Sequence, residues 1–477
     1  MASCLALDQE VTVKFTPHEY QQRAATFGVQ NACAGFFLDP GLGKTAIVLM
    51  IFDTLKKMRI AKKMLVITPL RPMYLTWPAE VKKWDEFKHL KIQCLHGPCK
   101  ASALYDDADV HVINPEGLKW LFSVVDDPSE HWDILCVDES TKFKHSDTER
   151  FRLLRPHLDK FRRRYILTGS PAPNGLLDLF GQVYILDLGA NLGRYVSHYL
   201  AQYFTQGYDG FSWEPRYGAE TEIYRKLSPL VLRMSQEDYL KLPECVGAAW
   251  TETPLIREVE LPPDVKKIYD KMESFLITEL ENDTVVAANA AAASGKCRQI
   301  ANGGLYGSKR RKDMNDERGM YDLHEEKTNA VEEIIEELQG VPALVAYEFE
   351  HDRDRLLKRF GKNTPWIGGG VSAGRFREIE ASWNSGSLPI LLAQPQSVSH
   401  GLNLQATRAA VIWHSITWDL ETYEQLIKRV WRQGQEHRTF VHHIVAKGTI
   451  DETVMKMLQK KDKVQRSLLT ALKERYT

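Results

Sequence analysis

Residues 38–45 have the composition of a loop that binds the phosphates of a nucleotide. The segment reads Leu38-Asp-Pro-Gly-Leu-Gly-Lys-Thr45, follows an apolar run and precedes the apolar stretch 46–51. Its glycines allow backbone N–H groups to turn toward phosphate oxygens, and the N-terminus of a following helix adds its dipole. Lys44 would reach the β- and γ-phosphates, and the Thr45 hydroxyl would bind Mg²⁺. Leu38 stands where the strict pattern has glycine. The residues assigned to the nucleotide here are Gly41, Leu42, Gly43, Lys44, Thr45 and Ala46.

Two carboxylates follow another apolar run. Residues 134–137 read Ile-Leu-Cys-Val, which is typical of a buried strand, and Asp138 and Glu139 come directly after them. Acidic residues at strand ends are usually solvated, but here a phosphate loop precedes them in the chain. Asp138 can then hold the Mg²⁺ that Thr45 also binds, and Glu139 can orient and polarise an attacking water. We therefore predict Lys44, Asp138 and Glu139 as catalytic residues.

A third group of chemically capable residues lies near the C-terminus. Gln425, Arg429 and Arg432 are spaced i, i+4 and i+7, so one face of a helix would present an amide and two guanidinium groups. The two arginines could neutralise charge that develops on a γ-phosphoryl group, or they could form an ordinary solvated basic face. The Gln-Gly-Gln stop and the nearby tryptophans favour the catalytic interpretation.

The elements that must position these residues follow an alternating pattern. Short apolar runs alternate with helix-length amphipathic stretches, which indicates an α/β fold with parallel sheets covered on both faces. Residues 181–340 read as helical and irregular, the Ala-rich segment 284–295 is undecided between helix and loop, and 451–476 predicts a terminal helix. The predicted strands are 35–38, 64–68, 110–114, 134–138 and 165–168 in the first half, and 343–347, 365–367, 389–392, 410–413 and 440–445 in the second.

Composition excludes several classes of protein. The 477 residues are 43% hydrophobic and 26% charged, which is typical of a folded globular chain and excludes disorder. No apolar run approaches the ~18 residues that cross a bilayer, and the N-terminus does not resemble a signal peptide. Of seven cysteines, only Cys94 and Cys99 lie close together, with no second pair at zinc spacing. We therefore expect a cytoplasmic protein without membrane or zinc.

The formal net charge of −1, taken as a sum, argues against a polyanionic partner. The charges are, however, distributed unevenly along the chain. Residues 142–164 hold nine Lys and Arg against three Asp and Glu, and residues 296–313 hold six against one. Residues 316–338 hold two basic residues against nine acidic ones, which masks the basic segments in the sum. As phosphate contacts, the basic segments would make binding to nucleic acid salt-dependent; the alternative is a solvated surface.

Further motifs match one family in order through most of the chain. The sequence resembles the Swi/Snf-type ATPases of helicase superfamily two, and is more similar to compact bacterial or bacteriophage members than to eukaryotic remodellers. Ser140-Thr141 departs from the Ala-His that the family usually has. The matching segments are Tyr20-Gln21 (Q motif), 39–45 (I), Thr68-Pro-Leu70 with Trp77, Glu80 and Trp84 (Ia), 114–118 (Ib), 138–141 with 143–144 (II), 167–174 (III), 228–233 with 242–243 (end of the first lobe), 399–405 with Trp418 (V) and 425–435 (VI).

The resemblance implies two tandem RecA-like lobes, residues 1–245 and 246–477, with helical protrusions from about residue 181 and over about 255–330. It implies ATP bound with Mg²⁺ between the lobes, hydrolysed to drive a monomer along double-stranded DNA, and single-stranded nucleic acid is an alternative partner. Arg429 and Arg432 would complete the ATP site. Additional ATP contacts implied by the motifs are Gln21, Gly401 and Gln425, and the implied DNA contacts are Thr68, Asn114, Ser399 and Trp418.

Two other functions remain open from the sequence. One is a helicase that separates the strands of DNA or RNA, although no aromatic hairpin between the lobes is evident in the sequence. The other is a nucleic-acid-binding protein that has lost hydrolysis. The presence of Lys44, Thr45, Asp138, Glu139, Arg429 and Arg432 disfavours the second alternative.

Overall fold

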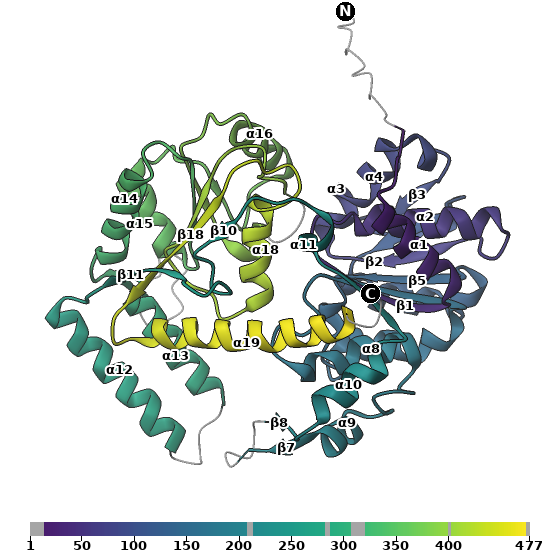
Figure 1. The fold of residues 1–477 in the computed structure, drawn as a ribbon, viewed down its shortest axis with the longest axis horizontal. Coiled ribbons are helices and arrows are strands. Elements are labelled where there is room, and N and C mark those ends of the chain that lie inside the picture. The colour runs from purple at the N-terminus through teal and green to yellow at the C-terminus, as the bar shows by residue number, and fades with distance from the viewer. Residues whose placement is uncertain (1–13, 208–212, 282–286, 307–319, 399–401, 474–477) are drawn as a thin grey trace, which may run out of the picture. The chain divides into compact units, whose positions relative to one another are not determined.

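The computed structural model describes residues 14–207, 213–281, 287–306, 320–398 and 402–473. The chain divides into two compact units, one of Met1–Leu240 with Val464–Thr477 and one of Lys241–Lys463. Each unit is built around its own parallel β-sheet, with helices packed against both faces (Figure 1). The predicted α/β class with parallel sheets is therefore confirmed.

The sheet of the first unit has seven parallel strands in the order β3-β4-β2-β5-β6-β1-β9. Parallel strands bring their C-terminal ends to one edge, where open α/β sheets bind ligands. The strands are β1 Cys33–Leu38, β2 Met64–Ile67, β3 Ile92–Cys94, β4 Val110–Ile113, β5 Ile134–Asp138, β6 Arg163–Thr168 and β9 Val231–Met234; β7 Phe204–Gln206 and β8 Trp213–Pro215 form a separate antiparallel pair. The helices are α1 Glu19–Gln30, α2 Lys44–Lys57, α3 Leu70–Leu75, α4 Trp77–Lys83, α5 Lys100–Tyr105, α6 Leu118–Val124, α7 Glu149–Leu154, α8 Leu179–Asp187, α9 Val196–Tyr203, α10 Ala219–Leu227 and α11 Gln236–Tyr239.

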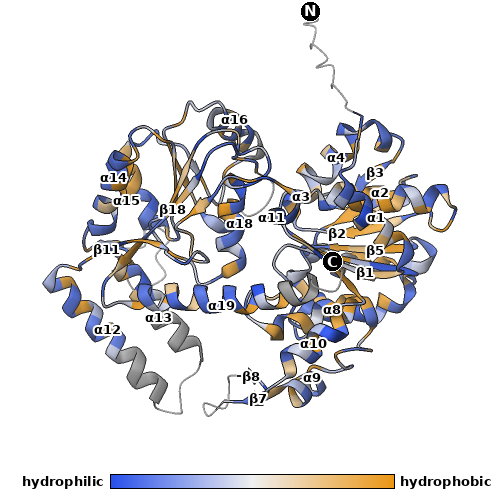
Figure 2. Cartoon of the chain, in the orientation of Figure 1, coloured by the Kyte–Doolittle hydropathy of each residue, from blue (hydrophilic) through white to orange (hydrophobic). Residues whose placement is uncertain are grey.

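Alternation along the strands divides the core of the first unit into two layers. In β2, Met64 and Val66 pack with α1, α2 and α4, whereas Leu65 and Ile67 pack in the cluster that contains α8, α9 and α10. A strand buried on both faces must be apolar at nearly every position, which explains the continuous apolar runs in the sequence. Figure 2 shows these strands mostly in orange, the colour of hydrophobic residues, and the helices beside them with both hydrophobic (orange) and hydrophilic (blue) residues.

The sheet of the second unit has the order β10-β18-β17-β14-β16-β15, and β11 also pairs with β18. Its strands are β10 Cys245–Val246, β11 Leu255–Val259, β14 Ala343–Ala346, β15 Trp366–Ile367, β16 Ile390–Ala393, β17 Ala410–Trp413 and β18 Thr439–Ala446; β12 Gly304–Tyr306 and β13 Met320–Asp322 form an antiparallel pair. The helices are α12 Pro263–Glu281, α13 Ala287–Ala301, α14 Glu326–Glu337, α15 Glu350–Phe360, α16 Ala373–Asn384, α17 Pro395–Val398, α18 Leu420–Val430 and α19 Ile450–Lys473.

The same alternation builds the core of the second unit. In β14, Leu344 and Ala346 pack in the cluster of α16 and α18, and Ala343 and Val345 pack in the cluster of α14 and α15. All four residues are fully buried. The sheet is therefore a central layer between two helical layers, as in the first unit.

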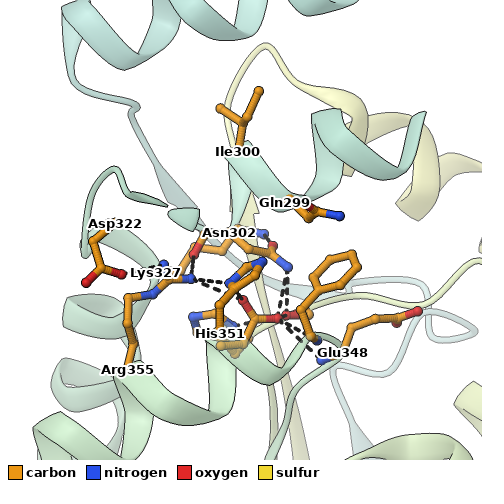
Figure 3. A network of polar contacts seen from close by, with 12 residues as sticks. Gln299, Ile300, Asn302, Asp322, Lys327, Glu348, His351 and Arg355 are labelled. Carbon is orange, nitrogen blue, oxygen red and sulfur yellow. Dashed lines mark hydrogen bonds and ion pairs between the residues drawn. The ribbon is translucent and has the colours of Figure 1, made fainter. Parts of the chain in front are cut away.

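A buried network of charged and polar side chains ties α13 to the sheet of the second unit (Figure 3). Asn302, which follows α13, donates from Nδ2 to Ser415 Oγ (2.9 Å) and to Asp352 Oδ2 (3.2 Å). Lys327 Nζ donates to Asn302 Oδ1 (2.7 Å) and lies 2.5 Å from Asp451 Oδ2. Lys327 and Asp352 are fully buried, and charges so far from water require partners of this kind. The network joins the ends of α13 and β17 to α14, α15 and α19.

The stretch 181–340 contains more strand than the sequence pattern predicts. The prediction of a helical and irregular region is right for α8–α10 and α12–α14 but misses β7–β13. The consequential omission is β9, which pairs with β1 at the edge of the first sheet. Residues 287–295 of the Ala-rich segment are helical, within α13, whereas 284–286 lie outside the described residues. The terminal helix is confirmed as α19.

No helix within the described ranges is both long and apolar enough to cross a membrane.

Candidate ATP site

The loop between β1 and α2 has the backbone conformation that phosphate binding requires. Gly41 and Gly43 have φ of 91° and 75°, in the left-handed region that glycine adopts without strain. A Cβ at Gly43 would also lie 2.6 Å from Gln21 Nε2. Lys44 Nζ donates to the carbonyl oxygen of Leu38 (2.9 Å), so the cation lies against the loop at the start of α2. Thr45 and Ala46 continue the first turn of α2.

Gln21 is fixed beside this loop. The backbone N–H of His18 donates to Gln21 Oε1 (2.9 Å), within the capping arrangement at the start of α1. Gln21 Nε2 donates to the carbonyl oxygen of Leu42 (3.4 Å), and Gln21 is only 6% exposed. The structure therefore brings the Q-motif glutamine to the phosphate loop, although Leu42 itself is fully buried and contributes packing.

Asp39 holds the loop to the last strand of the sheet, a role that the sequence did not reveal. Its carboxylate accepts from Arg233 Nη2 (3.0 Å) and from the backbone N–H of Gln236 (3.0 Å). Arg233 also donates to the carbonyl oxygens of Phe37 (3.0 Å) and Met234 (2.7 Å). Because the partners are nearly 200 residues apart in the chain, no local pattern could have indicated this pair.

Asp138 lies at the end of β5, within the electrostatic reach of Lys44. Its Oδ2 accepts from Thr68 Oγ1 (3.0 Å) and Trp77 Nε1 (3.1 Å). Burial, followed by the charge of Glu139, raises the pKa of Asp138 to about 6, while Trp77, Lys44 and Thr68 act in the opposite direction. The carboxylate is thus held by donors in a site that disfavours its charge, and a bound cation would relieve that penalty.

Glu139 has an unusual backbone conformation. Its φ is 52°, in the left-handed region that residues other than glycine rarely adopt. Glu139 directly precedes the short helical turn Ser140–Phe143. Its backbone N–H donates to Asp138 Oδ1 (3.1 Å). Such strain is kept only where the surroundings impose it, and it is enriched at active sites.

These residues fit ATP with Mg²⁺ by their chemistry. The loop supplies glycines and a lysine for phosphates, and Asp138 supplies the single carboxylate that Mg²⁺ commonly takes alongside phosphates and water. Within the described ranges no group of three or more His, Cys, Asp or Glu is placed to hold a metal alone. The donor set therefore suits a metal that arrives with a nucleotide.

Two residues predicted to contact DNA are buried in the first unit. Thr68 is 0% exposed, and its hydroxyl donates to Asp138. Asn114 is 6% exposed and donates from Nδ2 to Glu116 Oε2 (2.8 Å). Thr68 thus supports the carboxylate site directly, and the proposed DNA contact of either residue stays a prediction.

Two arginines of the basic segment 142–164 serve the fold. Arg163 donates to the carbonyl oxygens of Gly28 (3.2 Å) and Val29 (3.0 Å) at the end of α1, and Arg164 donates to that of Leu186 (2.9 Å) near the end of α8. Cations at helix C-termini satisfy carbonyls that have no partner within the helix. These two guanidinium groups therefore stabilise the fold, and the contact of the segment with phosphates stays a prediction.

In the second unit the predicted catalytic helix is shorter than expected. Gln425 and Arg429 lie on α18, but this helix ends at Val430 and Arg432 lies beyond it. Gln435 ends the helix, because its Nε2 donates to the carbonyl oxygens of Val430 (3.3 Å) and Thr407 (3.1 Å). The prediction that one helical face presents all three side chains is therefore wrong.

Arg429 and Arg432 nevertheless both reach the segment that contains motif V. Arg429 Nη1 donates to the carbonyl oxygen of Leu402 (3.4 Å), and Arg432 donates to Asn403 Oδ1. Gln425 Nε2 donates to Glu421 Oε1 (3.1 Å) on its own helix. Two other predicted residues, Ser399 and Gly401, lie outside the described residues.

Trp418 is half-buried and packs at the edge of the core that contains α16 and α18. Its carbonyl oxygen accepts from Lys461 Nζ (2.8 Å). The structure gives this tryptophan a packing role, and its proposed contact with DNA stays a prediction.

Comparison with known proteins places the chain in a family. The protein-family model of the SNF2-related domain matches residues 9–316, and the family model of the helicase conserved C-terminal domain matches residues 326–434. Protein p41 of Acyrthosiphon pisum secondary endosymbiont phage 1 is 34% identical, over 97% of this chain and 99% of the phage protein. An uncharacterized ATP-dependent helicase of Mycoplasma genitalium is 25% identical over 92% of this chain, which spans only 40% of that helicase.

Among solved structures, the SWI2/SNF2 ATPase core of Sulfolobus solfataricus in complex with dsDNA is 20% identical, with a TM-score of 0.45. It covers 98% of this chain, and the match covers 96% of that structure. The family resemblance read from the motifs is confirmed by the two family models and the phage relative. The chain belongs to the SNF2-related family of helicase-like ATPases.

Proposed function

We propose that this protein hydrolyses ATP with Mg²⁺ to move along double-stranded DNA. The observation that carries the proposal is the grouping of Lys44, Asp138 and Glu139 at the C-terminal edge of the first sheet. A phosphate loop, a strand-end aspartate and an adjacent glutamate are the parts that phosphoryl transfer to water needs. Membership of the SNF2-related family supports duplex DNA as the track.

Each residue has a distinct task in this proposal. The loop from Gly41 to Thr45 and the ammonium of Lys44 bind the phosphates. Thr45 and Asp138 would hold Mg²⁺, which when bound neutralises charge that develops on the phosphoryl oxygens. Glu139 orients the attacking water and accepts its proton.

The second unit would complete the site. We assign Arg429 and Arg432 to the charge on the γ-phosphoryl group, and Gln425 and Gly401 to the nucleotide. Their hydrogen bonds to residues 402 and 403 place both arginines beside the motif V segment. Hydrolysis then depends on residues from both units, which is what a cycle of ATP-driven movement requires.

Replacing Arg432 with alanine is expected to lower DNA-stimulated ATP turnover by about 10²-fold, the cost of removing one donor to transition-state charge while Arg429 remains. Arg375→Ala is a matched control, because Arg375 is exposed on α16 of the same unit and pairs with the exposed Glu378 three residues away (2.9 Å). The steady-state rate of ATP hydrolysis with saturating duplex DNA is measured for both variants. Full turnover in the Arg432 variant would show that the proposed two-unit active site is wrong.

A further inference from the structure

Helix α8 is in backbone contact with the turn that follows Glu139. Gly181 lies so close to this turn that a Cβ there would be 2.1 Å from the carbonyl oxygen of Phe143 and 2.8 Å from that of Lys144. Only glycine permits this approach. The helix and the turn are therefore packed without space between them, and the residue after Gly181, Gln182, is 0% exposed.

The Gln182 side chain has a partner for each of its polar groups. Its Oε1 accepts from Ser140 Oγ (2.7 Å), and its Nε2 donates to the carbonyl oxygens of Pro171 (2.7 Å) and Asp178 (2.8 Å). Ser140 is also 0% exposed and directly follows Glu139. A buried amide with all three hydrogen bonds made is held in one orientation, because losing any of them leaves an unpaired polar group.

Pro171 extends this link toward the phosphate loop. It belongs to the loop after β6, in which the backbone N–H of Ser170 donates to Thr168 Oγ1 (3.1 Å). In the same loop Gly169 packs against Pro40, where an added Cβ would lie 2.9 Å from Pro40 Cδ. One side chain thus connects the residue after Glu139 to a loop that touches the phosphate loop.

We propose that Gln182 is a positioning residue for ATP hydrolysis, one that holds Glu139 at a fixed place relative to the bound phosphates. The inference rests on the proposed function, and goes beyond it by assigning a task to a helix outside the motifs. Glu139 needs such support, because its φ of 52° is not a conformation that it adopts by preference.

The test replaces Gln182 with leucine, which has a similar volume and no hydrogen-bonding groups. Because a small displacement of a catalytic group can cost about 10²-fold in rate, we expect kcat to fall by about 10- to 100-fold while KM for ATP stays within about 2-fold. Single-turnover hydrolysis, expressed per molecule of bound ATP, counts only folded and loaded protein. Gln93→Leu is the control. Gln93 lies on β3, an edge strand of the same sheet, and its side chain makes an exposed hydrogen bond to Asp106 (3.3 Å).

A second variant separates positioning from stability. Ser140→Ala combined with Gln182→Leu removes the hydroxyl that the single change leaves unpaired, so thermal stability should recover toward wild type. The rate per bound ATP should remain low, because the link to Pro171 is still missing. If the rate per bound ATP of the double variant returns to the wild-type value, or if Gln182→Leu alone does not lower that rate, Gln182 has only a structural role and the inference is overturned. Absence of hydrolysis by the wild-type protein with duplex DNA would instead refute the proposed function.

Discussion

Replacing Glu139 with glutamine is expected to lower kcat for ATP hydrolysis on the order of 10³-fold while leaving ATP binding intact. Glutamine keeps the size of the side chain but cannot accept a proton from the attacking water, and general-base catalysis contributes about 10²–10⁴-fold. Binding should survive because the phosphate loop, Lys44 and Thr45 are unchanged. Removing the Glu139 charge also removes a repulsion that raises the pKa of Asp138, so the Asp138 carboxylate becomes easier to ionise.

Steady-state ATPase assays with saturating duplex DNA, paired with equilibrium binding of a fluorescent ATP analogue, measure the two effects separately. Glu149→Gln is a matched control, since Glu149 is 70% exposed at the start of α7 and pairs with exposed Lys119 (3.2 Å). Turnover within about 3-fold of wild type in the Glu139 variant would exclude Glu139 as the base. Loss of nucleotide binding would show that Glu139 belongs to the binding site instead.

Replacing Lys327 with methionine is expected to destabilise the second unit by about 3–5 kcal/mol, the usual cost of removing one partner from a buried ion pair. Methionine fills much the same volume but leaves Asp451 Oδ2 without the ammonium 2.5 Å away, and Asn302 Oδ1 without its donor. For a unit of this size, that loss lowers the melting temperature by about 10 °C. Thermal and urea unfolding followed by circular dichroism measure the change.

Lys358→Met is the control for this prediction, because Lys358 is 73% exposed on α15 and its contact with Glu325 is long (3.6 Å). The double change Lys327→Met with Asp451→Asn should recover part of the lost stability, since the unpaired charge is then gone. Equal melting temperatures for Lys327→Met and Lys358→Met would show that the network in Figure 3 contributes nothing to stability.

The strands that build both sheets could be predicted well from the sequence. Residues 134–138 and 410–413 form β5 and β17 with the predicted bounds, because a strand buried on both faces is apolar throughout and this pattern is local. The edge strands β3 and β9 of the first sheet were missed. β3 has only three residues, and β9 lies in a stretch that reads as helical and pairs with β1, almost 200 positions earlier.

The candidate site shows the same division between local and distant information. The phosphate loop and the Asp138–Glu139 pair are contiguous motifs, so their chemistry is legible in the sequence. The contacts of Arg233 with Asp39 and of Gln182 with Ser140 join residues that only the fold brings together. The end of α18 at Val430 was missed because the terminating hydrogen bonds come from Gln435, beyond the helix.

The central claim, ATP-driven movement along duplex DNA, is tested most directly by displacement of a third strand from a DNA triplex. We expect the wild-type protein with Mg²⁺ and ATP to displace that strand, Lys44→Ala to leave it bound, and a forked duplex to remain paired under the same conditions. Separation of the forked duplex without displacement from the triplex would contradict the account and identify a strand-separating helicase. Failure to displace the third strand while ATP is hydrolysed would likewise contradict it.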